Sequence, residues 1–183
     1  MRILKRVLNH EMRELLKKIK NSNFISYECE CVYGMTYGNL RINTDKYSIE
    51  ITNLEETADL FGEEEDVTGF KCAKVDGSED FKPYCIGMSK KYDINKKITG
   101  IKIINDFIVI DNEDMAMSYD QAIIFEMGDS SIMFSREAWF SENIDISEDD
   151  DYNSVYSVKS VEEVWQNGDP DRKVSVKRSV TIL

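Results

Sequence analysis

Residues 15–33, LLKKIKNSNFISYECECVY, decide the expected fold, because the spacing of apolar side chains changes inside this stretch. Up to residue 20, apolar residues recur every three or four positions, which is typical of an amphipathic helix. From residue 25 onward, apolar and polar residues alternate, which is typical of a strand with one buried face. The sequence therefore predicts a helix over residues 1–20, ended by Asn-Ser-Asn at 21–23, and a sheet after it.

The remainder of the chain mostly continues the two-residue period. The stretch NLEETADLF, which ends just before Gly62, is an exception and predicts a short helix. Glycine and aspartate in MGDS predict the turn of a hairpin between DQAIIFE and SIMFS. Further strands are predicted by alternating or apolar runs around residues 47–51, 67–75, 83–88, 98–104, 107–111 and 173–183.

Near the C-terminus, Ser160 and Glu163 match a capping box and predict a short helix that ends at Asn167 and Gly168. Before it, residues 147–158 are acidic and polar, and we expect them to form a long mobile loop. At this length we expect one domain over residues 1–183. Its expected fold is α+β, with an N-terminal amphipathic helix packed on a curled, mainly antiparallel β-sheet and with short inserted helices.

The charge of the chain is negative and unevenly distributed. Lysine and arginine number 23 against 35 acidic residues, a net charge of -12. Residues 47–70 hold eight acids and no base, and residues 137–158 hold seven acids and no base. Residues 1–20 hold seven bases and two acids. Such blocks indicate which partners a protein attracts, since charge steers association without determining the fold.

The basic residues of the first block would share one stripe of the expected helix. Three interpretations stay open: the stripe contacts RNA or DNA, it lies on an anionic membrane, or it docks on acidic residues of this chain or a second copy. The strong negative charge of the remaining chain favours docking on its own acids, or plain solvation. The stripe comprises Arg2, Arg6, Arg13, Lys17 and Lys20.

Neither a signal peptide nor a membrane span is expected. Charges interrupt the first twenty residues every two or three positions, and nothing later approaches the roughly 20 apolar residues that cross a bilayer. A cytoplasmic location is therefore expected, where cysteines stay reduced. The spacings of the four cysteines do not suit a zinc site, and buried apolar roles are expected for Cys29, Cys31, Cys72 and Cys85.

The sequence carries no catalytic signature. His10 is the one histidine, so serine and cysteine triads have little to draw on, and the glycine-rich phosphate-binding loops are absent. A metal-dependent hydrolase built from carboxylates is the less favoured alternative, because the surrounding negative charge would repel a nucleic-acid substrate. Its candidate ligands are Asp111, Glu113, Asp114 and Asp120. We otherwise expect no enzyme, no cofactor and no metal.

Acidic residues beside large aromatics suit a protein interface, because charge steers the encounter and aromatic anchors dominate binding energy. An array of carboxylates also imitates the phosphates of a nucleic acid. Trp139 and Phe140 are expected to pack in the core, as aromatics of their size usually do. The predicted partner-binding residues are Glu63, Glu64, Glu65, Asp66, Glu142, Asp145, Glu148, Asp149, Asp150, Asp151, Tyr152 and Tyr156.

Four segments together resemble small acidic proteins carried by phages and plasmids, among them anti-CRISPR proteins that inhibit Cas9. They are NHEMRELLKKI (9–19), SYDQAIIFE (118–126), REAWFSENIDI (136–146) and SVEEVWQNGDP (160–170). The resemblance implies a non-enzymatic inhibitor that binds the effector nuclease or its guide-RNA complex. It brings no family residue set onto these positions, and the basic N-terminal block departs from a purely acidic mimic of DNA.

The expected function is therefore that of an acidic binding protein. It would inhibit a nucleic-acid-handling effector, such as a Cas9-type nuclease with its guide RNA, by occupying a basic surface. An immunity protein that neutralises a basic toxin is an alternative that uses the same charges. The oligomeric state stays open.

Overall fold

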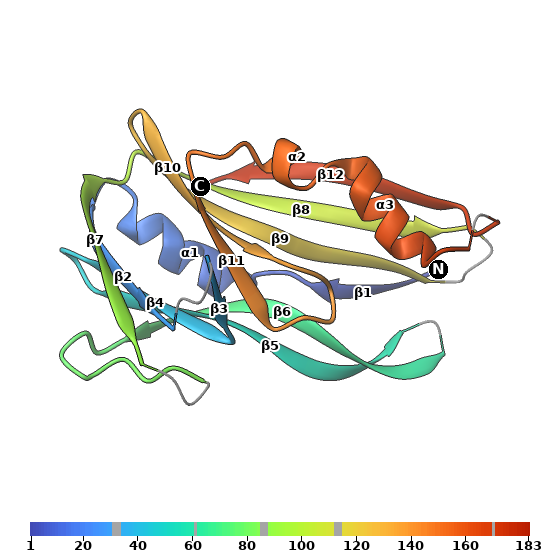
Figure 1. Ribbon diagram of the computed structural model, residues 1–183, viewed down its shortest axis with the longest axis horizontal. Coiled ribbons are helices and arrows are strands. Elements are labelled where there is room, and N and C mark those ends of the chain that lie inside the picture. The colour runs from blue at the N-terminus through green and yellow to red at the C-terminus, as the bar shows by residue number, and fades with distance from the viewer. Residues whose placement is uncertain (31–33, 61, 85–87, 112–114, 170) are drawn as a thin grey trace.

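A computed structural model describes residues 1–30, 34–60, 62–84, 88–111, 115–169 and 171–183. The described chain consists mainly of strands, with three helices (Figure 1). The helices are α1 (His10–Ile19), α2 (Tyr152–Val155) and α3 (Val158–Gln166). The strands are β1 (Arg2–Arg6), β2 (Asn23–Cys29), β3 (Met35–Tyr37), β4 (Asn39–Thr44), β5 (Ser48–Leu60), β6 (Glu63–Val75), β7 (Lys90–Lys97), β8 (Gly100–Ile110), β9 (Met115–Met127), β10 (Ser130–Arg136), β11 (Asn143–Glu148) and β12 (Val174–Ile182).

The strands form two sheets, so the expected fold of a helix packed on one curled sheet is wrong. One sheet has the order β12-β8-β9-β10-β11-β3, and the other has the order β6-β5-β4-β2-β7. All of these neighbours pair antiparallel, while β1 joins the larger sheet in parallel with β9. Helices are a minor part of the structure, because apolar alternation extends through most of the chain and demands a second layer of strands to cover it.

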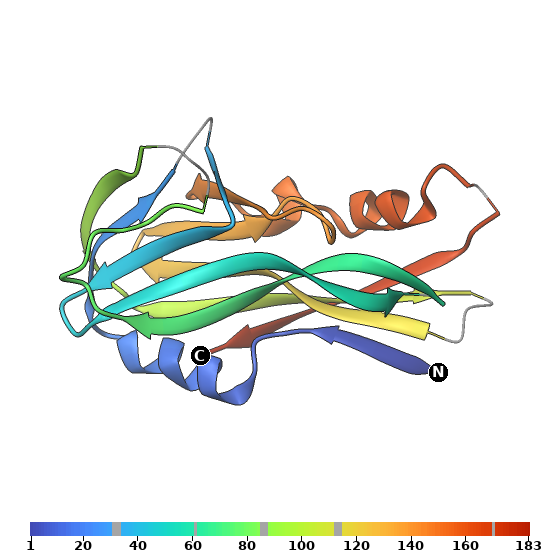
Figure 2. The same cartoon turned by 90° about the horizontal axis from the view of Figure 1, so that it is seen from below.

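The largest hydrophobic cluster joins the two sheets and α1. Phe24 on β2 and Phe125 on β9 meet edge to face in it, with ring centres 5.5 Å apart. Two further clusters lie where α2 and α3 cover the larger sheet, one around Trp165 and one around Tyr152. Figure 2 shows α1 and α3 on opposite sides of this sheet. Strand β9 is therefore buried on both faces, which explains its nearly continuous apolar sequence.

The N-terminal residues form a strand before the helix, which corrects the predicted helix over residues 1–20. Arg2 to Arg6 pair in parallel with Met115 to Tyr119 of β9. The helix begins only at His10, because the side chain of Asn9 accepts a hydrogen bond from the backbone N–H of Met12 and caps it. It ends at Ile19, close to the predicted stop.

The position of β1 separates the basic residues that a longer helix would have aligned. Arg2 forms an ion pair with Asp59, and Arg6 forms one with Glu56, which also contacts Lys71. Both acids lie on β5, within the acid-only block of residues 47–70. Docking on the acids of its own chain is thus the role of Arg2 and Arg6, and these contacts remove two carboxylates from the free acidic surface.

Asp59 provides a test of this N-terminal contact. The hydrogen bond from Arg2, followed by one from the N–H of Gly62, lowers its pKa from 3.8 to about 2. Because the folded pKa lies below the unfolded one, the interaction contributes stability above about pH 4 and loses it as the pH falls toward 2. In Arg2→Gln, the pKa of Asp59 followed by carboxyl-carbon NMR should rise toward its ordinary value. Lys5→Gln on the same strand is the control, and an unmoved pKa in Arg2→Gln would contradict the assignment.

A long two-stranded ribbon replaces the helix predicted for NLEETADLF. Strand β5 pairs with β6 without interruption, from Ser48 opposite Val75 to Leu60 opposite Glu63. The leucines, glutamates and alanine of this stretch favour a helix locally, but thirteen residues of cross-strand pairing override that preference. The ribbon brings its acid-rich end, beyond residue 55, out past the neighbouring strand β4.

Several other predicted strands are present, but some of their first and last residues differ from the prediction. The hairpin over 120–135 is confirmed as β9 and β10, with Gly128 at φ 75° in its turn. The C-terminal strand is confirmed as β12. Strands predicted at 98–104 and 107–111 are one strand, β8, whose register shifts between Ile104 and Asn105. The strand predicted at 83–88 falls partly outside the described residues, and the next strand, β7, begins at Lys90.

The acidic segment 147–158 is structured for most of its length, contrary to the expected mobile loop. Strand β11 extends to Glu148, α2 begins at Tyr152, and α3 begins at Val158. The N-cap of α3 is Ser157, which accepts from the N–H of Ser160, so the helix starts before the predicted capping box. Its end is as predicted, with Asn167 in the left-handed conformation.

Two expectations about the whole chain can be compared with the described residues. Cys29 and Cys72 are buried, as predicted, whereas Cys31 and Cys85 lie outside the described residues. Within the described ranges, no helix has the length and apolar character needed to traverse a membrane.

Candidate partner-binding surface

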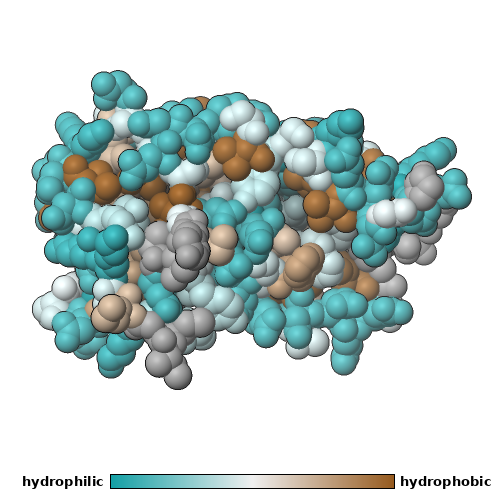
Figure 3. All heavy atoms as spheres, viewed as in Figure 1, coloured by the Kyte–Doolittle hydropathy of each residue, from teal (hydrophilic) through white to brown (hydrophobic). Residues whose placement is uncertain are grey.

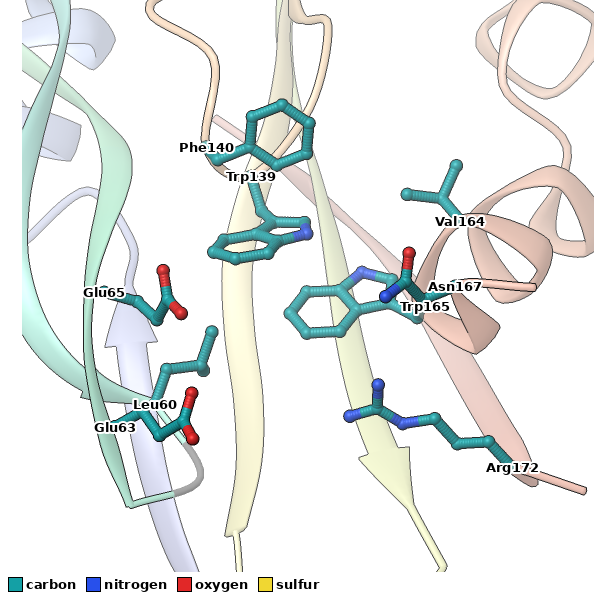
Figure 4. A pocket seen from close by; sticks show the side chains of 9 residues that line it. All are labelled: Leu60, Glu63, Glu65, Trp139, Phe140, Val164, Trp165, Asn167 and Arg172. Carbon is teal, nitrogen blue, oxygen red and sulfur yellow. The ribbon is translucent and has the colours of Figure 1, made fainter. Parts of the chain in front are cut away.

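A cleft with an aromatic floor lies between the β5–β6 ribbon and α3. Its volume is about 430 Å³. The rings of Trp139 and Trp165 stack with centres 5.3 Å apart and planes 25° apart, and Phe140 meets Trp139 edge on at 5.2 Å. Figure 4 shows Glu63 and Glu65 on the ribbon wall and Arg172 on the opposite wall. We call this the tryptophan cleft; its lining comprises Leu60, Glu63, Glu65, Trp139, Phe140, Val164, Trp165, Asn167 and Arg172.

A second hollow, of about 370 Å³, lies on the other side of Phe140. Three carboxylates line it: Glu55 from the ribbon, and Glu137 and Glu142 from the segment between β10 and β11. Glu142 accepts a hydrogen bond from the backbone N–H of Glu55 at 3.1 Å, which joins the two acid-only blocks of the sequence. We call this the acidic hollow; Tyr37, Ala138, Phe140, Ser141 and Asn143 complete its lining.

Phe140 lines both depressions and is 57% exposed. Figure 3 shows hydrophobic side chains gathered between α3 and the ribbon, within a largely hydrophilic surface. Val164, 54% exposed, belongs to the same region. An exposed aromatic side chain with carboxylates on both sides is suited to a protein interface, because it combines an apolar anchor with steering charge. We call this region, with its two depressions, the Phe140 face.

The segment carrying Trp139 and Phe140 is held from beneath by a buried arginine. Arg136, 0% exposed, donates from Nη2 to the backbone oxygen and the hydroxyl of Thr68 and to the backbone oxygen of Trp139. The N–H of Thr68 also donates to Trp139, at 2.9 Å. Burial lowers the pKa of Arg136 to about 10, so its guanidinium is charged at neutral pH. These bonds fix the segment to β6 and thereby present Phe140 outward.

Two carboxylates of the acidic hollow, those of Glu137 and Glu142, are fixed by hydrogen bonds without an ion pair to a described lysine or arginine. Glu137 accepts hydrogen bonds from Asn143 and from Ser141, and these bonds lower the pKa of its carboxyl group. Glu137 is therefore ionised at neutral pH, although no described lysine or arginine forms an ion pair with it. A fixed, unneutralised carboxylate favours an external cation, because little side-chain ordering remains to be done on binding.

The structure brings only some of the predicted partner-binding residues together. Glu63 and Glu65 line the tryptophan cleft, and Glu142 lines the acidic hollow. Glu64, between the two cleft glutamates, is exposed but does not line the cleft, since successive side chains of a strand point to opposite faces. Asp66 accepts a hydrogen bond from Thr57 across the ribbon. The predicted set is thus divided between different surfaces.

The acidic run after β11 lies apart from the Phe140 face. Glu148, Asp150 and Asp151 are exposed at the end of β11 opposite to Glu142. Asp149 accepts from the N–H of Ser131 at 2.6 Å and so connects this run to the β9–β10 turn. The run is a second acidic patch, and its role in binding stays a prediction.

The tyrosines beside this run face the body of the protein. Tyr152 is 2% exposed, with the guanidinium of Arg178 4.4 Å from its ring centre. Tyr156 is half-buried and donates its hydroxyl proton to Asp145. Burial raises the pKa of Asp145, which is itself half-buried. Tyr152 therefore has almost no surface to offer a partner, because its ring covers the outer face of the larger sheet.

The carboxylates proposed as metal ligands do not converge in the described residues. Asp120 is 0% exposed and accepts hydrogen bonds from the N–H of Leu8 and from Asn105. Asp111 lies six residues beyond Asn105 along the same hairpin, about 20 Å away at the rise of a strand. Glu113 and Asp114 lie outside the described residues. Asp120 instead joins the start of α1 to the sheet.

Several residues of the Phe140 face were missed from the sequence. Glu55 and Glu137 lie within the acid-only blocks, but nothing in their spacing shows that they meet. Trp165 is in a predicted helix, and its contact with Trp139 depends on how α3 lies on the sheet. Arg136 could have been identified from the sequence, because an arginine that ends an apolar strand is expected to be buried and to need hydrogen-bond acceptors.

Comparison with known proteins found no matching family model, curated protein or solved structure, so the chemistry of the Phe140 face rests on the residues described above.

Proposed function

We propose that this protein is a non-enzymatic binding protein whose Phe140 face occupies a basic surface on a nucleic-acid-handling partner. The observation that carries the proposal is the convergence of five carboxylates around one exposed aromatic ring. They are Glu55, Glu63, Glu65, Glu137 and Glu142. A groove lined with lysine and arginine is the complementary surface, and a protein that fills it competes with nucleic acid for the same cations.

The Phe140 face supplies both the charge and the apolar surface that such an interface needs. The acidic hollow supplies fixed charge, which accelerates the encounter and makes it dependent on salt. Phe140 and Val164 supply apolar surface that is removed from water on contact. A Cas9-type effector nuclease is the partner suggested by the resemblance of the four sequence segments. An immunity protein would use the same face and differ only in its partner.

The test is binding to a purified Cas9–guide RNA complex over a series of salt concentrations. We expect the unmodified protein to bind and to reduce binding of target DNA by the complex. The variant Glu55→Gln with Glu137→Gln and Glu142→Gln should bind about tenfold or more weakly, with a flatter dependence on salt, because it lacks three charges of the interface. Circular dichroism should show that the variant keeps its fold.

A matched control removes the same charge from the second acidic patch. Glu148→Gln with Asp150→Asn and Asp151→Asn leaves Asp149, which binds the backbone of Ser131, unchanged. This triple variant should bind within about twofold of the unmodified protein, as expected for charges outside the contact. A loss confined to the control would assign the contact to the second patch. Affinity unaffected by both variants and by salt would reject acidic binding altogether.

A further inference from the structure

We propose that the tryptophan cleft receives the guanidinium group of one arginine side chain from the partner. This inference rests on the proposed function and adds a chemical identity to one point of the contact. It starts from the floor of the cleft, where the faces of Trp139 and Trp165 are stacked and Phe140 stands beside them. Aromatic faces attract cations, tryptophan most strongly, and a planar guanidinium also stacks on them.

The ribbon wall supplies the negative charge that the floor lacks. Glu63 and Glu65 lie two residues apart on β6, so their side chains project from the same face of the strand, and both line the cleft. They are exposed, and neither forms an ion pair with a described lysine or arginine. A carboxylate binds guanidinium through two parallel hydrogen bonds, a geometry that an ammonium group cannot match.

The mouth of the cleft suits the rest of an arginine side chain. Phe140 and Val164 are both more than half exposed there and offer apolar contact to three methylene groups. Leu60, 5% exposed, adds an apolar contact on the ribbon side. The cleft thus combines apolar contacts for the stem, the rings of Trp139 and Phe140 for the plane, and carboxylates for the N–H groups, while Trp165, 4% exposed, supports Trp139.

Arg172 on the opposite wall determines whether removal of its charge strengthens or weakens ligand binding. With two glutamates and one arginine, the charged side chains of the cleft sum to one negative charge. An entering guanidinium is attracted by Glu63 and Glu65 and repelled by Arg172. Removing the charge of Arg172 should therefore tighten binding of a cation, whereas it would weaken binding of an anion.

Intrinsic fluorescence measures the cleft directly, because the chain has two tryptophans and both line it. The probe is N-acetyl-arginine amide, titrated at constant ionic strength. We expect a saturable change in tryptophan emission. N-acetyl-citrulline amide, which has nearly the same shape without the charge, should bind about tenfold more weakly, since it lacks the charge-assisted hydrogen bonds.

Variants test whether binding depends on the two glutamates that line the cleft and not on Glu64 between them. Glu63→Gln with Glu65→Gln should weaken arginine binding about tenfold. The control Glu64→Gln removes an acid of the same ribbon that points away from the cleft, and it should change the affinity by less than twofold. Arg172→Gln should strengthen binding severalfold. Circular dichroism verifies the fold of each variant.

The outcomes distinguish this inference from the proposed function. Arginine binding that fails to saturate, or that is weakened equally by Glu64→Gln, would overturn the arginine site even if the Cas9 complex still binds through the acidic hollow. Weaker binding of the arginine probe in Arg172→Gln would also overturn it, because a guanidinium held in this cleft is repelled by Arg172. Conversely, a cleft that binds the arginine probe in a protein that binds no Cas9 complex would retain the site and reject the proposed partner.

Discussion

Asp106→Ala is expected to reduce the free energy of unfolding by about 3–5 kcal/mol, because it leaves a largely buried arginine without its anion. Asp106 is 0% exposed and lies directly opposite Arg178 in the β8–β12 pair. The guanidinium donates from Nε and Nη2 to the two carboxylate oxygens, both at 2.8 Å. Urea unfolding followed by circular dichroism measures the loss.

Arg178 makes the loss larger than one ion pair would suggest. Its Nη1 donates to the backbone oxygen of Tyr156 and to the side chain of Asn153, and its guanidinium lies over the ring of Tyr152. Removing Asp106 therefore loosens the attachment of α2 as well as the pairing of two strands. The same measurement on Arg178→Lys, which keeps the charge but not the paired hydrogen bonds, should give an intermediate loss.

The control for this pair is Lys177→Ala, an exposed residue on the same strand. Its free energy of unfolding should stay within about 0.5 kcal/mol of the unmodified protein. If Asp106→Ala lost less than about 1 kcal/mol, the pair would have no more effect than an exposed ion pair, and the assigned role would be wrong.

Phe125→Ala is expected to reduce the free energy of unfolding by about 3–5 kcal/mol through the cavity that it leaves. Phe125 on β9 is 0% exposed and contacts Phe24 of the other sheet and Phe134 of β10 edge to face, at 5.5 Å and 5.9 Å. It connects the two sheets at the centre of the largest cluster. Urea unfolding followed by circular dichroism again provides the measurement.

Phe140→Ala is the matched control, since it removes the same side chain from an exposed position. Its stability should change by about 0.5 kcal/mol or less. A large loss in Phe140→Ala would mean that this ring belongs to the core and is not available to a partner. A loss below about 1 kcal/mol in Phe125→Ala would contradict its assignment to the core.

Local patterns in the sequence predicted individual strands better than their arrangement. Alternation identified β2, β12 and the β9–β10 hairpin, because one buried face leaves a two-residue period. The same rule cannot identify β1, whose five residues RILKR take their conformation from pairing with β9 more than a hundred positions away. It also failed in β5, where helix-forming residues pair with β6. Two sheets were not foreseen, since periodicity gives the buried face of a strand and not what covers it.

For the candidate surface, the sequence predicted which segments carry negative charge, but it did not predict which of their side chains lie together in the fold. Glu63, Glu65 and Glu142 were identified from acid-only blocks and were found to line the two depressions. Phe140 was expected in the core by its size, yet it is exposed, because Arg136 and Thr68 hold the preceding residue from below. Tyr152 shows the opposite error, since its polar neighbours in the sequence hide a buried ring. Such outcomes depend on contacts between distant segments.

The parallel pairing of β1 with β9 has a consequence for how the chain is made. Residues 2–6 are synthesised more than a hundred residues before the strand edge that receives them, at residues 115–119, so they stay unpaired on that edge while the intervening chain is made. Strand β10, which is synthesised after β9, pairs with residues 122–127 of the same edge through a short turn and leaves the place of β1 open. An early segment of the nascent chain is thus secured only after β9 has emerged, so its pairing is delayed by the order of synthesis.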